Sequence, residues 1–235
     1  MMKMNTGGSK RRRKMEENLT KEYFFTLLDG AEALIGGDSL REEHSEYDYT
    51  VTAPEKKAET VSSFDEDIAS CHRCPSCFSR RIYAEPTLNP GSDFLFVLPS
   101  PEGDTMLSAD SYSYYTKWVK AMGREMRNVS ITSLIRCPVP FRKEAADNCR
   151  DYLREEMKNL RPKAIVLLGE ETAQYMLRRQ LPLDTLRLHS YRINGIRTFV
   201  TYTPLSLVRD RSLRGKIWED LKYMMSETAA GENRA

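Results

Sequence analysis

The side chains best suited to chemistry are five cysteines, Cys71, Cys74, Cys77, Cys137 and Cys149, three of which share the run CHRCPSC. Thiolates at Cys-x2-Cys spacing can turn toward one metal from a tight loop, and their soft sulfur atoms suit zinc or an iron–sulfur cluster. A cytosolic chain rarely builds a disulfide framework. The spacing leaves zinc, an iron–sulfur cluster and thiols without a ligand all open.

The elements that would position such residues follow from short apolar runs at 94–98, 128–134, 163–169 and 197–202. They alternate with helical patterns at 111–122, 143–160, 170–180 and 212–226. This alternation predicts a three-layer α/β/α fold with a central, mainly parallel four-stranded sheet. Ligands of such sheets bind at the carboxyl ends of the strands, so we expect a site in the loops after Leu98, Leu134 and Tyr202.

The rest of the chain divides by composition. We expect residues 1–67 to form a basic tail, a helix over 18–35 and an acidic flexible linker, residues 68–228 to form the α/β domain, and residues 229–235 to form a disordered tail. Translation from Met1 or from Met15 fits the sequence. No apolar run is long enough for a membrane span or a secretory signal, which predicts a cytoplasmic protein.

Charge is distributed unevenly along the chain. Residues 1–70 hold 10 Lys and Arg against 15 Asp and Glu, whereas residues 71–235 hold 26 against 19. A basic domain behind an acidic leader is compatible with a polyanionic partner such as DNA, because neutralised phosphates release counterions.

From Cys71 to about residue 225 the sequence resembles the family 4, iron–sulfur uracil-DNA glycosylases. The matching segments, in order, are CHRCP (71–75), SLIRCPVP (133–140), ADNCRDYLREEMKNLRPKAIVLLGEETAQYML (146–177) and TYTPLSLVRDRSLRGKIWEDLK (201–222). The resemblance implies that Cys71, Cys74, Cys137 and Cys149 ligate a structural [4Fe-4S] cluster. Cys77 would be an additional thiol near it.

The resemblance also implies chemistry on a base flipped out of DNA. The family places a Glu that assists water, an Asn that binds uracil and a His that stabilises the leaving base where this chain has Pro99, Ser133 and Thr203, and its stacking Phe corresponds to Leu107. Proline has neither a proton-transferring side chain nor a backbone N–H. The sequence therefore predicts a degenerate site in which uracil excision is weak or absent.

Nearby residues offer substitutes. Ser100, Leu107, Ser133 and Thr203 would line the base pocket, and Glu102 and Asp104 are candidate catalytic residues, although a solvated turn is the more common explanation for two such carboxylates. Arg209, Arg211 and Arg214 lie where the family contacts phosphates, or they form a solvated start of a helix. Tyr112, Tyr114 and Tyr115 would stack on bases or pack in the core.

Three hypotheses follow from these features. The preferred one is a monomeric, DNA-binding [4Fe-4S] protein linked to DNA repair. The second is an active DNA glycosylase that hydrolyses the N-glycosidic bond of uracil or another damaged base. The third is a non-enzymatic interaction protein that recruits a partner through its acidic N-terminal segment.

Overall fold

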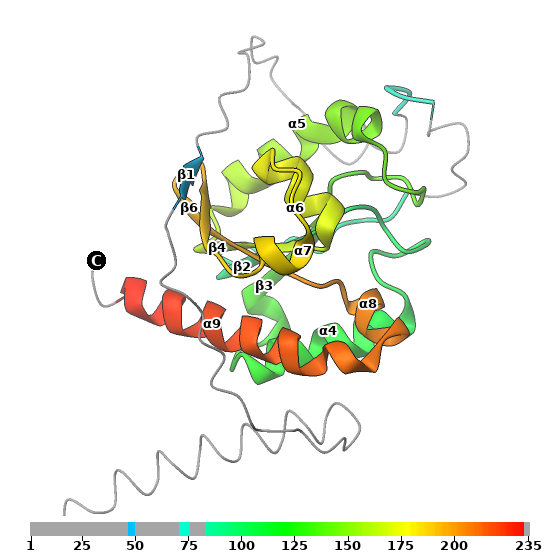
Figure 1. The fold of residues 1–235 in the computed structure, drawn as a ribbon. Coiled ribbons are helices and arrows are strands. Elements are labelled where there is room, and N and C mark those ends of the chain that lie inside the picture. The colour runs from blue at the N-terminus through cyan, green and yellow to red at the C-terminus, as the bar shows by residue number, and fades with distance from the viewer. Residues whose placement is uncertain (1–46, 50–70, 76–82, 233–235) are drawn as a thin grey trace, which may run out of the picture.

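The computed structural model describes residues 47–49, 71–75 and 83–232. Most of the predicted basic tail, the predicted helix over 18–35, Cys77 and the last three residues lie outside this part. Figure 1 shows a central sheet with helices on both faces, which confirms the predicted α/β/α layering. Within the described ranges, no helix is long and apolar enough to cross a membrane.

The sheet has six strands in the order β1-β5-β6-β4-β2-β3. Their bounds are Tyr47–Tyr49 for β1, Phe94–Leu98 for β2, Val129–Ser133 for β3, Ala164–Leu168 for β4, Tyr191–Ile193 for β5 and Ile196–Thr201 for β6. The four predicted strands pair in parallel, which confirms the mainly parallel sheet.

The predicted count of four strands is wrong, because β5 pairs antiparallel with β6 and β1 pairs parallel with β5. Both additional strands have three residues, too few to produce a recognisable alternation in the sequence. β5 and β6 are joined by Asn194 and Gly195, both at positive φ, as a tight two-residue hairpin requires. Strand β1 falls within the segment predicted to be a linker.

The helices are α4 (Ala109–Ala121), α5 (Lys143–Leu160), α6 (Glu170–Leu177), α7 (Leu183–Leu186), α8 (Pro204–Arg209) and α9 (Arg214–Glu232), with 3-10 turns η1 (Met126–Asn128) and η2 (Arg211–Leu213). Helix α6 ends earlier than predicted because Arg178 adopts the left-handed conformation at φ 54°. Helix α9 begins two residues later than predicted and continues to Glu232, past the predicted domain end at 228.

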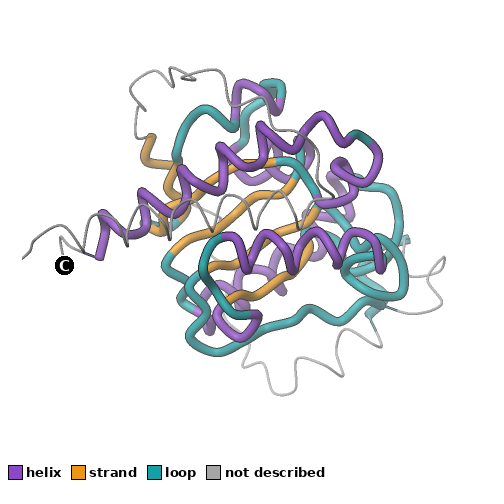
Figure 2. Tube along the Cα trace, turned by 90° about the horizontal axis from the view of Figure 1, so that it is seen from below, coloured by secondary structure: helices purple, strands orange, loops and turns teal. Residues whose placement is uncertain are grey.

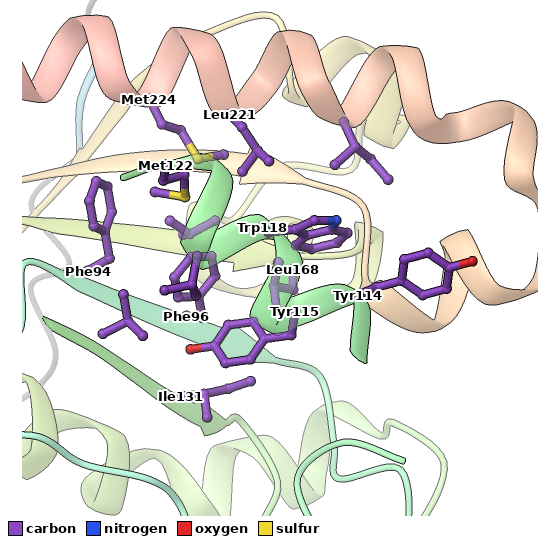
Figure 3. Packing of buried hydrophobic residues seen from close by; sticks show 14 of the residues in the cluster. Phe94, Phe96, Tyr114, Tyr115, Trp118, Met122, Ile131, Leu168, Leu221 and Met224 are labelled. Carbon is purple, nitrogen blue, oxygen red and sulfur yellow. The ribbon is translucent and has the colours of Figure 1, made fainter. Parts of the chain in front are cut away.

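Two hydrophobic clusters bury the two faces of the sheet. Phe94, Phe96 and Leu98 of β2 point toward α4 and α9, whereas Leu95 and Val97 point toward α5 and α6. Figure 2 shows the strands enclosed between the helices. In the first cluster, Trp118 and Tyr115 of α4 lie over the sheet, and the ring of Tyr115 meets that of Phe96 edge to face at 5.3 Å (Figure 3).

Candidate functional site

The four parallel strands end at one edge of the sheet and bring the predicted loops together. Leu98 of β2 pairs with Ser133 of β3, and beyond the strands the amide of Ile135 donates to the carbonyl oxygen of Pro99 at 3.2 Å. On the other side, the amide of Gly169, after β4, donates to the carbonyl oxygen of Thr201 at 2.8 Å. The loops that carry Pro99, Ser133 and Thr203 therefore lie along the same edge.

Gly169 allows the Thr203 loop to approach β4 closely. Its φ is 85°, and a Cβ atom added there would lie 2.9 Å from Cγ2 of Thr203. A side chain at position 169 would be strained by the backbone and would push Thr203 away. The glycine thus fixes how near the last loop lies to the centre of the edge.

The hydroxyls of Ser133 and Thr203 are engaged within their own loops. Ser133 is fully buried, and its Oγ donates to the carbonyl oxygen of Ile135 at 2.7 Å. Thr203 is the N-cap of α8: its Oγ1 accepts from the amide of Ser206 at 3.0 Å and shares a 2.8 Å hydrogen bond with the Ser206 hydroxyl. Both hydroxyls shape the local backbone.

Glu102 is also tied to a helix start. Its Oε2 accepts from the amide of Ser108 at 3.0 Å and from the Ser108 hydroxyl at 2.7 Å, and Ser108 is the N-cap of α4. Its Oε1 is buried and has no hydrogen-bond partner among the described residues. One carboxylate oxygen thus supports the helix, and the other is buried and unpaired within the described part of the chain.

The remaining predicted pocket residues differ in accessibility. Ser100 is half-buried and Asp104 is exposed. Leu107 is 6% exposed and belongs to the core cluster between the sheet, α4 and α9. Leu107 thus contributes to the hydrophobic core below the loop that joins β2 to α4.

Behind the Thr203 loop, a buried ion pair joins three elements. Asp220 of α9, 1% exposed, accepts from Nε and Nη2 of Arg187 at 3.0 and 2.9 Å and from the Thr201 hydroxyl at 2.7 Å. Arg187 also donates to the backbone oxygen of Lys216 at 2.8 Å. A bidentate, charge-assisted contact of this kind fixes orientation as well as distance. It holds β6, the end of α7 and α9 together.

A second polar group, near the surface, lies beside this pair. The Tyr202 hydroxyl donates to Asp184, and Lys216 Nζ donates to the same carboxylate at 3.1 and 3.2 Å. The hydrogen bond from Tyr202, followed by that from Lys216, lowers the pKa of Asp184. The hydrogen bond to Asp184 raises the pKa of Lys216. This group fastens Tyr202, the residue before Thr203, to α7 and α9.

The four cysteines predicted as ligands lie at the start of the described domain, in the loop after β3 and on α5. Cys137 and Cys149 are buried, Cys71 and Cys74 are half-buried, and none forms a disulfide with another described residue. Burial raises the pKa of the Cys149 thiol; the backbone N–H and the charge of Arg136 oppose this, and the charges of Cys74 and Cys71 raise it further. Cys149 therefore lies within electrostatic reach of two other cysteines.

Two observations bear on what the cysteines can hold. Across residues 47–49, 71–75 and 83–232, no three His, Cys, Asp or Glu side chains are arranged to hold a single metal ion. Burial, and then the interaction of its hydroxyl with the Cys71 thiol, raises the pKa of Tyr152 of α5 to about 12. Cys71 and Cys74 thus lie near Cys149 of α5, and the described residues form no single-ion site.

A buried ion pair connects the cysteine region to the sheet. Arg136, next to Cys137, pairs with Glu156 of α5, and the two side chains are 2% and 5% exposed. The hydroxyl of Thr132 donates to Glu156 at 2.8 Å and also accepts from Arg136. The loop that carries Cys137 is thereby fixed to the end of β3, one residue before Ser133.

With this geometry in place, comparison with known proteins identifies the family. The model for the uracil DNA glycosylase superfamily matches residues 104–222, half of the chain. The chain belongs to this superfamily. The match confirms the predicted relationship, and it includes both Cys137 and Cys149 as well as the Asp220 network.

Individual relatives support the predicted resemblance to family 4. A type-4 uracil-DNA glycosylase of Archaeoglobus fulgidus is 25% identical over 127 residues, which cover 50% of this chain and 64% of that protein. A type-4 enzyme of Sulfurisphaera tokodaii is 25% identical over 184 residues, 70% of this chain and 83% of that protein. A type-5 enzyme of Pyrobaculum aerophilum is 34% identical over 90 residues, 36% of this chain and 40% of that protein. The chain thus spans less than two thirds of the Archaeoglobus and Pyrobaculum proteins.

The three arginines predicted to bind DNA are not equivalent in this superfamily member. Arg209 and Arg211, at the end of α8 and in η2, are exposed. Arg214, the first residue of α9, is 8% exposed, and its Nε has no hydrogen-bond partner among the described residues. Two of the arginines are thus free to meet a polyanion directly, and the third is a buried cation beside them.

The sequence reasoning missed the side chains that hold the edge in place. Asp220 stands inside the matched segment WEDLK, so its presence was visible, but its partner Arg187 lies 33 positions earlier. Nothing in the sequence indicated a structural role for Glu156 or Asp184, because charged residues in amphipathic helices are usually exposed to solvent. Only the folded chain shows that Glu156 is buried against Arg136.

Proposed function

We propose that this protein is a DNA-binding [4Fe-4S] member of the uracil DNA glycosylase superfamily, linked to DNA repair, with weak or absent uracil excision. The observation that carries the proposal is the state of the strand-end loops. Pro99 offers no polar side chain, and the hydroxyls of Ser133 and Thr203 bond within their own loops. By the resemblance to family 4, an edge with these residues would lack the groups that act on uracil.

The energetic consequence is large. Removing one donor that stabilises a developing charge typically costs about 3 kcal/mol. Losing two such groups and the residue that orients water removes on the order of 5 to 9 kcal/mol, as an upper range because groups that act together are not additive. The total catalytic stabilisation of an enzyme is roughly 8 to 23 kcal/mol. Efficient uracil release is therefore not expected.

Cys71, Cys74, Cys137 and Cys149 would hold the cluster. Free thiols, with Cys71 and Cys74 near Cys149, suit iron–sulfur chemistry. Each thiolate of a four-iron cluster binds a different iron, and four cysteines can supply one ligand to each of the four iron atoms. When bound, the cluster would tie residues 71–75 and the loop after β3 to α5.

The cluster is tested by metal content. Protein purified without oxygen should be brown, with broad absorbance near ~400 nm and iron bound. Replacing Cys71, Cys74, Cys137 or Cys149 by Ala should each remove iron, whereas Cys77→Ala, the matched control, should keep it. Colourless protein with one zinc ion would contradict this assignment, and loss of iron in the Cys77 variant alone would reassign the ligands.

DNA binding is tested through the salt dependence of affinity. Arg209→Ala and Arg211→Ala should each weaken binding and reduce the slope of log affinity against log salt by about one unit. Arg127→Ala, an exposed arginine of η1 at the opposite edge of the sheet, is the control and should leave the slope unchanged. Arg214→Ala should also weaken binding, and the triple variant of Arg209, Arg211 and Arg214 combines the three changes. Unchanged affinity in the triple variant would place the interface elsewhere.

One observation favours a second candidate, an active glycosylase on uracil or another damaged base. Oε1 of Glu102, in the loop after β2, has no hydrogen-bond partner among the described residues, so a water admitted beside it would find an unoccupied acceptor. A panel of damaged-base duplexes tests this candidate. Excision of any base that Glu102→Gln abolishes would support it, with Asp104→Asn as the comparison. No excision across the panel would support the binding role.

A further inference from the structure

A groove with a volume of about 790 Å³ lies on the sheet face covered by α5 and α6, away from the strand-end loops around Thr203. It follows α5 from Lys143 to Met157, and Ile193 and Asn194 of the β5–β6 hairpin complete its lining. Figure 1 shows α5 and α6 together on this side of the sheet, with α4 and α9 on the other. No part of the proposed function uses this groove.

The chemistry of the groove is mixed. Its apolar lining includes Leu134, Ala146, Leu153, Met157 and Ile193, all of them buried. Four cationic side chains also line it, those of Lys143, Arg150, Arg154 and Arg178, against two carboxylates. An apolar surface bordered by cations suits an acidic peptide with apolar side chains better than a nucleic-acid backbone, which needs no apolar contact.

Several of the groove's polar groups lack partners. Lys143, Arg150 and Arg178 form no ion pair with another described residue, and Nε of Arg150 is buried without a hydrogen-bond partner. Asp147, one of the two carboxylates, is engaged by the Tyr175 hydroxyl at 2.9 Å. A buried donor without an acceptor is costly, so the groove should gain from an anionic occupant.

The positions of β1 and of Cys71 indicate which part of the chain could occupy the groove. Tyr49 pairs with Ile193, so the chain leaves β1 directly beside a residue that lines the groove. The next described residue, Cys71, packs against Cys149 and Tyr152 on the neighbouring face of α5. The described residues that flank the segment 50–70 therefore lie at one end of the groove, for Tyr49, and beside the helix that forms one of its walls, for Cys71.

The sequence of this segment matches the groove. Residues 50–70, TVTAPEKKAETVSSFDEDIAS, contain five Asp or Glu and two Lys, and the run Asp65-Glu66-Asp67 stands between Phe64 and Ile68. A chain of this length reaches up to about 70 Å when extended, and the 15 residues of α5 from Lys143 to Met157 span only about 20 Å. Attachment at both ends also gives the segment a high effective concentration at the groove.

We propose that residues 50–70 of this chain bind in the α5–α6 groove, with the acidic run against its cations and the flanking apolar side chains against its apolar lining.

Trypsin cleavage of the full-length protein tests this binding, because Lys56 and Lys57 are the only basic residues in the segment. Cleavage after them reports how often the segment leaves the groove. Arg150→Glu with Arg178→Glu should speed this cleavage roughly tenfold, through lost attraction and added repulsion. Lys120→Glu with Arg127→Glu, the same charge change at exposed positions outside the groove, should leave the rate unchanged. Circular dichroism and thermal melting verify that both variants fold.

A double-mutant cycle completes the test. Neutralising Asp65, Glu66 and Asp67 to Asn, Gln and Asn should speed cleavage by itself, yet add little to the groove variant, because both changes remove one interaction. Equal rates in the groove and control variants, or fully additive effects, would overturn the proposal. Protection that is lost on dilution would place the segment of a second copy in the groove and would also overturn it.

Discussion

The polar side chains at the strand-end edge and those directly behind it are organised in opposite ways. Behind the edge, Arg187, Asp220 and Thr201 join three elements that are far apart in the chain, and Asp220 is almost completely buried. At the edge, Ser133 and Thr203 bond to residues two or three positions away. The inner group fixes how the elements sit relative to one another, whereas the outer group shapes only its own loops. The buried group therefore positions the strand ends, whereas the loop hydroxyls stabilise the loops that carry them.

The largest effect should come from the inner group. Asp220→Ala leaves Arg187 buried without its carboxylate partner, so the free energy of unfolding should fall by about 3 to 5 kcal/mol. Urea denaturation measures it. Asp184→Ala, which removes a carboxylate of the neighbouring surface group that is 59% exposed, should cost below about 1 kcal/mol. Equal losses in the two variants would remove the distinction between the buried inner group and the surface group of Asp184.

A smaller effect is expected at the edge. Thr203→Ala removes the N-cap of α8 and should lower the free energy of unfolding by about 1 kcal/mol, while Thr203→Ser keeps the capping oxygen and should be nearly neutral. Urea denaturation of the three proteins makes the comparison. If Ala and Ser destabilise equally, the hydroxyl of Thr203 is not a cap and is available for another role.

The smallest effect is a pH dependence in the surface group. The pKa of Asp184 is lowered, so its contribution is present above the ordinary value of 3.8 and is lost as pH falls through the folded-state pKa. The pKa of Lys216 is raised, so its contribution is present below 10.5 and is lost as pH rises through the folded-state pKa.

Wild type should therefore exceed Lys216→Met in stability by less than about 1 kcal/mol near neutral pH, and the difference should shrink below pH 3.8 and above pH 10.5. Thermal melting across pH measures it. A difference that grows in acid would show that Lys216 does not act through Asp184.

The sequence predicted the fold most accurately where apolar patterns are long. The strand at 94–98 and the helix at 143–160 are confirmed residue for residue. β5 was missed because three residues carry no usable period, although its Asn194-Gly195 turn was visible. Of the three tyrosines on α4, Tyr114 and Tyr115 are buried and Tyr112 is 51% exposed, a distinction that depends on how α4 sits on the sheet.

The location of the candidate site could be predicted from the sequence. The hydrogen bonds that its side chains form could not. Strand ends placed Pro99, Ser133 and Thr203 on one edge, as parallel pairing requires. The hydrogen bond from the Ser133 hydroxyl to the carbonyl oxygen of Ile135 depends on the path of the loop after β3. That path cannot be predicted from the types of the residues in the loop. The burial of Arg214 beside two exposed arginines is likewise a product of tertiary packing.

Uracil release from single- and double-stranded DNA tests the degenerate site most directly, measured for the cluster-loaded wild type and for the combined variant Pro99→Glu, Ser133→Asn and Thr203→His. The wild type should release little or no uracil, and the combined variant should gain measurable release because the missing groups return to an edge that the inner network still positions. Single reversions should do little, since the groups act as a unit. Robust uracil release by the unmodified protein would contradict the account.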